Sequence, residues 1–123
     1  MNIIIDTHMF LWAVAEPDRI GLSRRAELET PANNVYVSAV SIAEIMIKAS
    51  LGKLVVNFDP VEIALASGFL LLEFGVHDAM PLKDLPFHHR DPFDRMLIAQ
   101  AITRGHHLMT DDQAFSAYNC KLA

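Results

Sequence analysis

The sequence predicts one α/β domain with a mostly parallel sheet. Three observations support this fold class. Strand-like and helix-like segments alternate along the chain, residues 2–6 contain an unbroken β-branched run typical of buried parallel strands, and 123 residues suffice for one hydrophobic core. We therefore expect a single α/β domain that spans residues 1–123.

The expected strands are short apolar runs bounded by turn residues or helix signals. They cover residues 2–6, 35–38, 70–74 and 107–110, with a short edge strand at 121–123. The helices are expected to start at capping residues and to end at glycine or proline. Thr7 is the expected N-cap of a helix over residues 8–15, and the others are expected over residues 23–29, 41–51, 60–66, 76–82 and 92–105.

Composition restricts the classes of function. No apolar run approaches the roughly 18 residues of a membrane span, and no signal peptide is visible, so we expect no membrane association. The single cysteine cannot form an internal disulfide, which fits a cytoplasmic location. The net charge of −5 argues against a nucleic-acid binder, unless metal ions rather than lysines hold the phosphates.

Carboxylates follow the ends of several predicted elements. Asp6 ends the first strand, Asp111 and Asp112 follow a later strand, and Glu44 and Asp94 lie near the starts of helices. In an open parallel sheet, the carboxyl ends of the strands and the following helix starts share one edge, where ligands bind. These carboxylates are therefore expected to converge there.

Clustered carboxylates repel one another unless a cation neutralises them. Oxygen ligands suit Mg²⁺ or Mn²⁺, and a metal held by carboxylates supports in-line attack on a phosphodiester. The sequence therefore favours the chemistry of a metal-dependent nuclease.

Each acid also has a purely structural interpretation. Asp91 is a suitable N-cap before Pro92, and Ser41 and Glu44 match a capping box. Asp111 and Asp112 are both suited to begin a turn, and the sequence leaves open which of them points inward.

Four segments resemble the motifs of PIN-domain ribonucleases, in particular the VapC-like toxins of type II toxin–antitoxin systems. The segments appear in the family's order and span nearly the whole chain. They are IIIDTH at residues 3–8, SIAEI at residues 41–45, DPFDRMLIAQA at residues 91–101 and LMTDDQAF at residues 108–115. The third segment is the most specific of them.

The resemblance implies that Asp6, Glu44, Asp94 and Asp112 are the catalytic, metal-binding acids. It implies a PIN-like fold, which is a three-layer α/β/α sandwich around a mostly parallel central sheet. It also implies Mg²⁺- or Mn²⁺-dependent cleavage of RNA and a homodimer. It also implies a cognate VapB-like antitoxin, which lays a segment over an apolar groove of the toxin and inserts an arginine among the acids. Thr7 would be a polar residue of the site.

Four further residues are weaker candidates for a supporting role or for substrate contact. Asp91 and Asp111 are acids beside the matched positions. Arg95 either contacts RNA phosphate or, as we favour, forms an ion pair with Asp91 four residues earlier. His88 is a candidate for contact with substrate or antitoxin, since no Cys/His spacing in the chain forms a zinc pattern.

The main alternative is a PIN-like interaction module without catalysis. Such proteins typically lack one or more of the acids, whereas all four positions are filled here. Aspartyl-phosphate hydrolases are disfavoured, because they need a second aspartate where this chain has His8. A phosphate-binding loop is also absent, since the five glycines do not cluster.

Overall fold

The computed structural model describes all 123 residues and contains a sheet of five strands. The strand order is β3-β2-β1-β4-β5, and every neighbouring pair is parallel. The strands are β1 (Asn2–Ile5), β2 (Asn34–Ser38), β3 (Leu70–Leu72), β4 (His107–Met109) and β5 (Lys121–Leu122). The prediction of a mostly parallel α/β sheet is confirmed.

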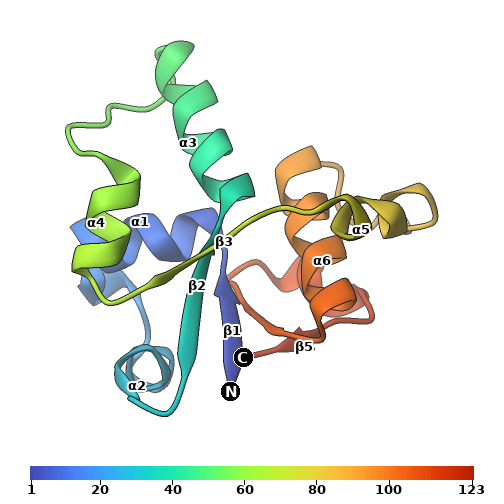
Figure 1. Ribbon diagram of the computed structural model, residues 1–123, viewed down its shortest axis with the longest axis horizontal. Helices are drawn as coiled ribbons and strands as arrows, with labels where there is room; N and C mark the ends of the chain where they lie inside the picture. Colours follow the sequence, from blue (N-terminus) through green and yellow to red (C-terminus); the bar gives the residue numbers. More distant parts are fainter.

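Helices cover both faces of this sheet (Figure 1). Helices α1, α2 and α4 lie on one side, and α5 and α6 lie on the other, while α3 continues from β2 beyond the sheet. The helices are α1 (Thr7–Ala15), α2 (Leu22–Glu29), α3 (Ala39–Ser50), α4 (Pro60–Ala66), α5 (Val76–Ala79) and α6 (Pro92–Arg104). Three short 3₁₀ helices complete the chain, namely η1 (Pro17–Arg19), η2 (Met80–Lys83) and η3 (Gln113–Ala117).

The isoleucines of β1 show why both faces of the sheet need a cover. All are fully buried, and successive side chains of a strand point to opposite faces. Ile3 and Ile5 belong to a core cluster with Met9 and Phe10 of α1, whereas Ile4 belongs to a second cluster with residues of α6 such as Leu97. The continuous apolar run of β1 therefore supplies two cores.

Strand β1 is also the topological switch point of the sheet. Its neighbours are β2 on one side and β4 on the other, so the chain builds the sheet outward in both directions. In such sheets the crevice at the carboxyl ends of the two strands at the switch point is the usual ligand site. Here that crevice lies between the ends of β1 and β4.

Two helix starts differ from the sequence-based expectation. The N-cap of α1 is Asp6, whose side chain accepts a hydrogen bond from the Met9 N–H, so the expectation that Thr7 is the cap was wrong. Helix α3 begins at Ala39 with Ser38 as its N-cap, which leaves no capping box for Glu44. In both cases a polar residue earlier in the chain already supplies the acceptor that the helix needs.

A buried polar network fastens the segment after β3 to α6. Gln100 is fully buried; its amide oxygen accepts from the Ser38 hydroxyl at 2.6 Å, and its amide nitrogen donates to the Glu73 carbonyl at 2.9 Å. The buried Asp78 pairs with Arg104 through two hydrogen bonds of 2.9 and 3.0 Å.

No helix has the length and apolar character that crossing a membrane requires.

Candidate functional site

The carboxylates predicted to converge lie around the switch point of the sheet. Asp6 follows β1 directly, Asp112 follows β4, and Asp94 lies in the first turn of α6. Glu44 comes from α3, the helix that follows β2. The negative charges of Asp6 and Glu44 both raise the pKa of Asp94, as expected for acids that share one region.

Asp94 is the most perturbed acid of this group. Burial, and then the negative charge of Asp91, raise its pKa to about 7. Its side chain is 20% exposed, so the carboxyl group is reachable from solvent. A carboxyl group with such a pKa is half protonated at neutral pH and lies in a field that favours a bound cation.

Asp6 is almost completely buried. Burial raises its pKa, while hydrogen bonds from the Thr110 hydroxyl and the Met9 N–H act in the opposite direction. Asp6 therefore has two roles, because the carboxylate that caps α1 also lies at the switch point.

Glu44 uses both carboxylate oxygens in contacts within the protein. Oε1 accepts a hydrogen bond from the Thr7 hydroxyl at 2.6 Å, and Oε2 lies 2.6 Å from the ammonium group of Lys48. The Thr7 hydroxyl also lies 3.0 Å from the hydroxyl of Ser41. Glu44 is thus buried but fully paired, which is how a carboxylate is tolerated on the inner face of a helix.

Asp112 meets the imidazole of His89. Nε2 of His89 lies 2.9 Å from Oδ2 of Asp112 and 3.1 Å from Oδ2 of Asp94. The other oxygen of Asp112 caps η3 by accepting from the Ala114 N–H. That hydrogen bond, together with the one to His89, holds the pKa of Asp112 below its ordinary value.

The carboxylates of the two acids next to the matched positions have other partners. Asp91 caps α6 by accepting from the N–H groups of Phe93 and Asp94, as the capping interpretation predicted. Asp111 points to Arg24 of α2 at 3.2 Å, whereas Asp112 faces Asp94 through His89. Arg24, Asp111 and Asp112 also line a pocket of about 190 Å³ beside the site.

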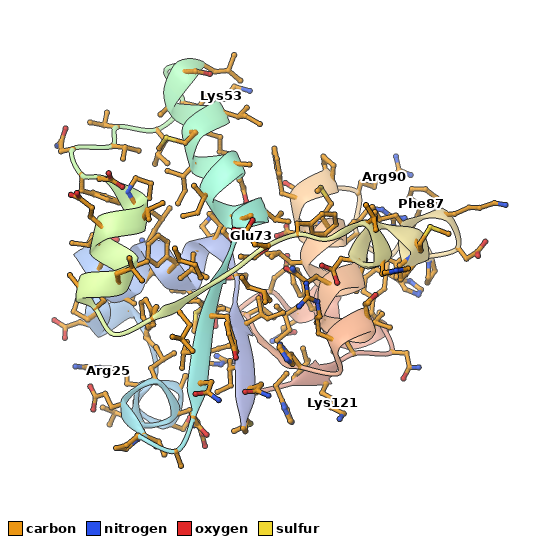
Figure 2. All side chains as sticks on the ribbon, viewed as in Figure 1. Arg25, Lys53, Glu73, Phe87, Arg90 and Lys121 are labelled. Atoms are coloured by element: carbon orange, nitrogen blue, oxygen red, sulfur yellow. The ribbon has the colours of Figure 1, made fainter.

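Arg95 forms no ion pair with Asp91, the role that we favoured for it, and its contact with RNA phosphate stays a prediction. It is buried, and its guanidinium donates to the carbonyl oxygens of Pro86 at 2.8 Å and Leu85 at 2.9 Å. It also stacks on the ring of Phe87, which lies on the segment outside α6 (Figure 2). The segment before α6 forms no regular strand or helix, so its carbonyl groups need such a donor.

His88 is exposed, and its ring meets the edge of Tyr118 at a centroid distance of 5.2 Å. Its contact with substrate or antitoxin stays a prediction. Sequence reasoning missed the neighbouring His89 and Lys48 as members of the site. The spacing of Glu44 and Lys48, four residues apart on one helix, was a signal for their ion pair, but nothing local distinguished His89 from His88.

The donor set fits a divalent cation of the Mg²⁺ type. A carboxylate oxygen of Asp94 and one of Asp112 lie within 4.8 Å of each other, with the His89 ring beside them. Asp6 adds a further carboxylate, whose charge acts on Asp94. Hard oxygen ligands predominate, and no cysteine takes part. Burial is the main cause of the raised pKa of Asp94, and the negative charges of Asp91, Glu44 and Asp6 add to it.

Comparisons with known proteins agree on the fold. The sequence pattern of the PIN domain matches residues 3–119. The chain is similar in structure to VapBC2 from Rickettsia felis bound to a DNA fragment from their promoter, with a TM-score of 0.75, 15% identity, and coverage of 99% of this chain and 96% of that one.

Two further solved structures are also similar to this chain. DNA-bound VapBC from Salmonella typhimurium has a TM-score of 0.64 at 15% identity, with coverage of 99% and 96% of the two chains. FitAcB from Neisseria gonorrhoeae has a TM-score of 0.57 at 18% identity, with coverage of 98% and 95%. No curated protein sequence is significantly similar to the chain.

Proposed function

Because this chain belongs to the PIN-domain family, we propose that it is a metal-dependent endoribonuclease and the toxin of a VapBC-like toxin–antitoxin pair. One observation carries the proposal, namely the convergence of carboxylates around the switch point with the pKa of Asp94 raised to about 7. A structural protein gains nothing from burying like charges together, whereas a nuclease needs them to bind a cation.

Asp6 and Asp94 would hold the main Mg²⁺ or Mn²⁺ ion, and Glu44 and Asp112 would complete the acidic ring directly or through water. When bound, such an ion polarises a phosphate oxygen and lowers the pKa of a water molecule. The polypeptide positions the acids: the first turn of α1 fixes Asp6, Thr7 and Lys48 fix Glu44, and the helix start at Asp91 fixes Asp94.

The acidic character of the chain does not contradict an RNA substrate. A bound divalent ion reverses the sign of the local field, so a net charge of −5 no longer repels the scissile phosphate. Lys48 and Arg24 lie at the border of the site and are partly exposed, each beside an acid. Both are suited to contact phosphates of an RNA strand that passes over the site.

An apolar groove next to the site fits the expected antitoxin. A pocket of about 300 Å³ lies between α3, α4 and β3, and its lining is mostly apolar, including Val37, Ile42, Val61 and Leu71. We propose that a segment of a VapB-like antitoxin lies along this groove. The negative charge of the chain would favour a basic segment, and an arginine from it would fit among the acids.

The experiment that tests the activity compares the parent chain with Asp6→Asn on total RNA of the host cell, with Mg²⁺, with Mn²⁺ and with EDTA. We expect discrete RNA fragments from the parent chain only, and none in EDTA. Mapping the fragment ends would then identify the RNA target. Equal cleavage by both proteins would contradict the carboxylate mechanism.

The alternative of a non-catalytic interaction module predicts a different result. In that case, the metal-loaded parent chain, freed of any bound antitoxin, leaves host RNA intact.

A further inference from the structure

The ring of His89 lies between the two carboxylates that follow β4 and begin α6. Its Nε2 is 2.9 Å from Oδ2 of Asp112 and 3.1 Å from Oδ2 of Asp94. These distances alone allow two roles. Nε2 either offers its lone pair to a metal ion beside the two acids or donates a proton to them.

The other ring nitrogen decides between these roles. Nδ1 of His89 lies 3.1 Å from the backbone nitrogen of Asp91, which has a proton and can only donate. Nδ1 must therefore accept, and in a neutral imidazole the ring proton is then on Nε2. A ring with its proton on Nδ1 would bring that proton against the N–H of Asp91. In this arrangement Nε2 is a donor and has no free lone pair for a metal.

The ring is held in this orientation from several sides. The backbone N–H of His89 donates to the Tyr118 hydroxyl at 2.6 Å, and the His89 carbonyl accepts from the Arg95 guanidinium at 3.3 Å. The ring meets the fully buried Phe115 at a centroid distance of 5.5 Å and an interplanar angle of 87°. Both the backbone and the ring are thus fixed by the protein itself.

Asp112 depends on this ring more than Asp94 does. Its side chain is 45% exposed and lies on the segment between β4 and the short helix η3. Apart from the cap of η3 through Oδ1, its only side-chain contact is with His89. Asp94, in contrast, is on the long helix α6.

We infer that His89 is a positioning residue that donates from Nε2 to hold Asp112 beside Asp94, and that it does not bind the metal. The inference rests on the proposed function, since it assigns His89 to the same nuclease site. Residues that orient metal-binding acids typically change metal affinity by about 10- to 100-fold when they are removed. The same range is expected here.

The test uses the full-length chain and three variants. His89→Leu removes the donor, and His89→Gln keeps a donor, because the amide nitrogen of glutamine reaches about as far as Nε2 of histidine. His77→Leu is the control, since the exposed His77 lies on α5, outside the candidate site. Thermal unfolding confirms that each variant folds before Mg²⁺ affinity is measured by calorimetry and cleavage is measured on host RNA.

We expect His89→Leu to bind Mg²⁺ about 10- to 100-fold more weakly than the parent, with His89→Gln close to the parent and His77→Leu unchanged. Equal loss in the leucine and glutamine variants would overturn the donor role, and unchanged Mg²⁺ affinity in His89→Leu would overturn the positioning role. If the parent itself neither binds Mg²⁺ nor cleaves RNA, the proposed function fails instead.

A spectroscopic measurement tests the tautomer independently of activity. Long-range ¹H–¹⁵N correlation spectra distinguish a protonated from an unprotonated ring nitrogen. We expect the proton of His89 on Nε2 in the metal-free protein, and we expect it to stay there when Mg²⁺ is added. A proton on Nδ1 would overturn the donor role, and loss of the Nε2 proton on addition of Mg²⁺ would show that His89 is a metal ligand.

Discussion

The ammonium group of Lys48 lies 2.6 Å from Oε2 of Glu44, a carboxylate with only 4% of its side chain exposed. The two residues are one helical turn apart on α3, so the helix itself sets their distance. Hydrogen bonding to Glu44 raises the pKa of Lys48, which keeps the lysine charged. The acidic site therefore contains one cation of its own.

Replacing Lys48 with methionine should leave Glu44 buried with the Thr7 hydroxyl as its remaining side-chain donor. We expect a loss of stability on the order of 1 kcal/mol, since half of a partly exposed ion pair is removed. We also expect Mg²⁺ to bind several-fold more tightly, because a competing positive charge is gone. Urea unfolding and calorimetry measure the two effects.

Lys53→Met is the control for this prediction. Lys53 is exposed just beyond α3 (Figure 2) and pairs with no acid. The Lys53→Met substitution should change neither stability nor Mg²⁺ affinity by a measurable amount. If the Lys48 and Lys53 variants behave alike, the ion pair does not affect the charge of the site.

The pKa of Asp94 makes stability depend on pH. It is raised from 3.8 to about 7 by burial and by Asp91, so the fold favours the protonated carboxyl group. This contribution to stability is fully present below pH 3.8 and is lost as the pH rises to about 7. Relative to Asp94→Asn, which does not titrate, the parent should become less stable across this window.

Mg²⁺ should reverse this loss, because a bound cation favours the ionised carboxylate. The increase in melting temperature on addition of Mg²⁺ should therefore be larger at about pH 8 than at about pH 5.5 in the parent chain. In Asp94→Asn, the increase in melting temperature on addition of Mg²⁺ should be small at both pH values. A pH-independent Mg²⁺ effect in the parent would show that Asp94 is not linked to the metal.

The Thr7 hydroxyl offers a conservative test of Glu44. Thr7→Val keeps the shape of the side chain but removes the donor that lies 2.6 Å from Oε1. We expect RNA cleavage to fall roughly tenfold, because the carboxylate is no longer held in place, while the protein stays folded. Thr7→Ser retains the hydroxyl and should recover most of the activity. Equal activity in Thr7→Val and the parent would remove Thr7 from the site.

Replacing Arg95 should lower the stability of the fold. Its guanidinium satisfies carbonyl groups of Pro86 and Leu85 and stacks on Phe87. Lysine cannot reproduce this planar set of donors, so Arg95→Lys should lower the free energy of unfolding by about 2 kcal/mol. Arg90→Lys on the same segment, where the arginine is exposed, should cost little. Urea unfolding of both variants measures the difference.

The sequence by itself determined the strands and the placement of the acids at their ends. Three consecutive isoleucines favour a strand that is buried on both faces, as is typical of a parallel sheet, and the chain order then places Asp6 and Asp112 at one edge. These inferences depend on local patterns and on the connectivity of parallel strands, and both can be inferred from the sequence alone.

Only the tertiary structure decided which polar groups meet. Asp6 rather than Thr7 caps α1, which frees the Thr7 hydroxyl for Glu44, and Arg95 turns to the preceding segment instead of Asp91. His89 was indistinguishable from His88 in the sequence, yet only His89 reaches Asp94 and Asp112. Each of these partnerships depends on angstrom-scale distances between segments far apart in the chain or on the direction of a side chain, and neither is set by periodicity or spacing.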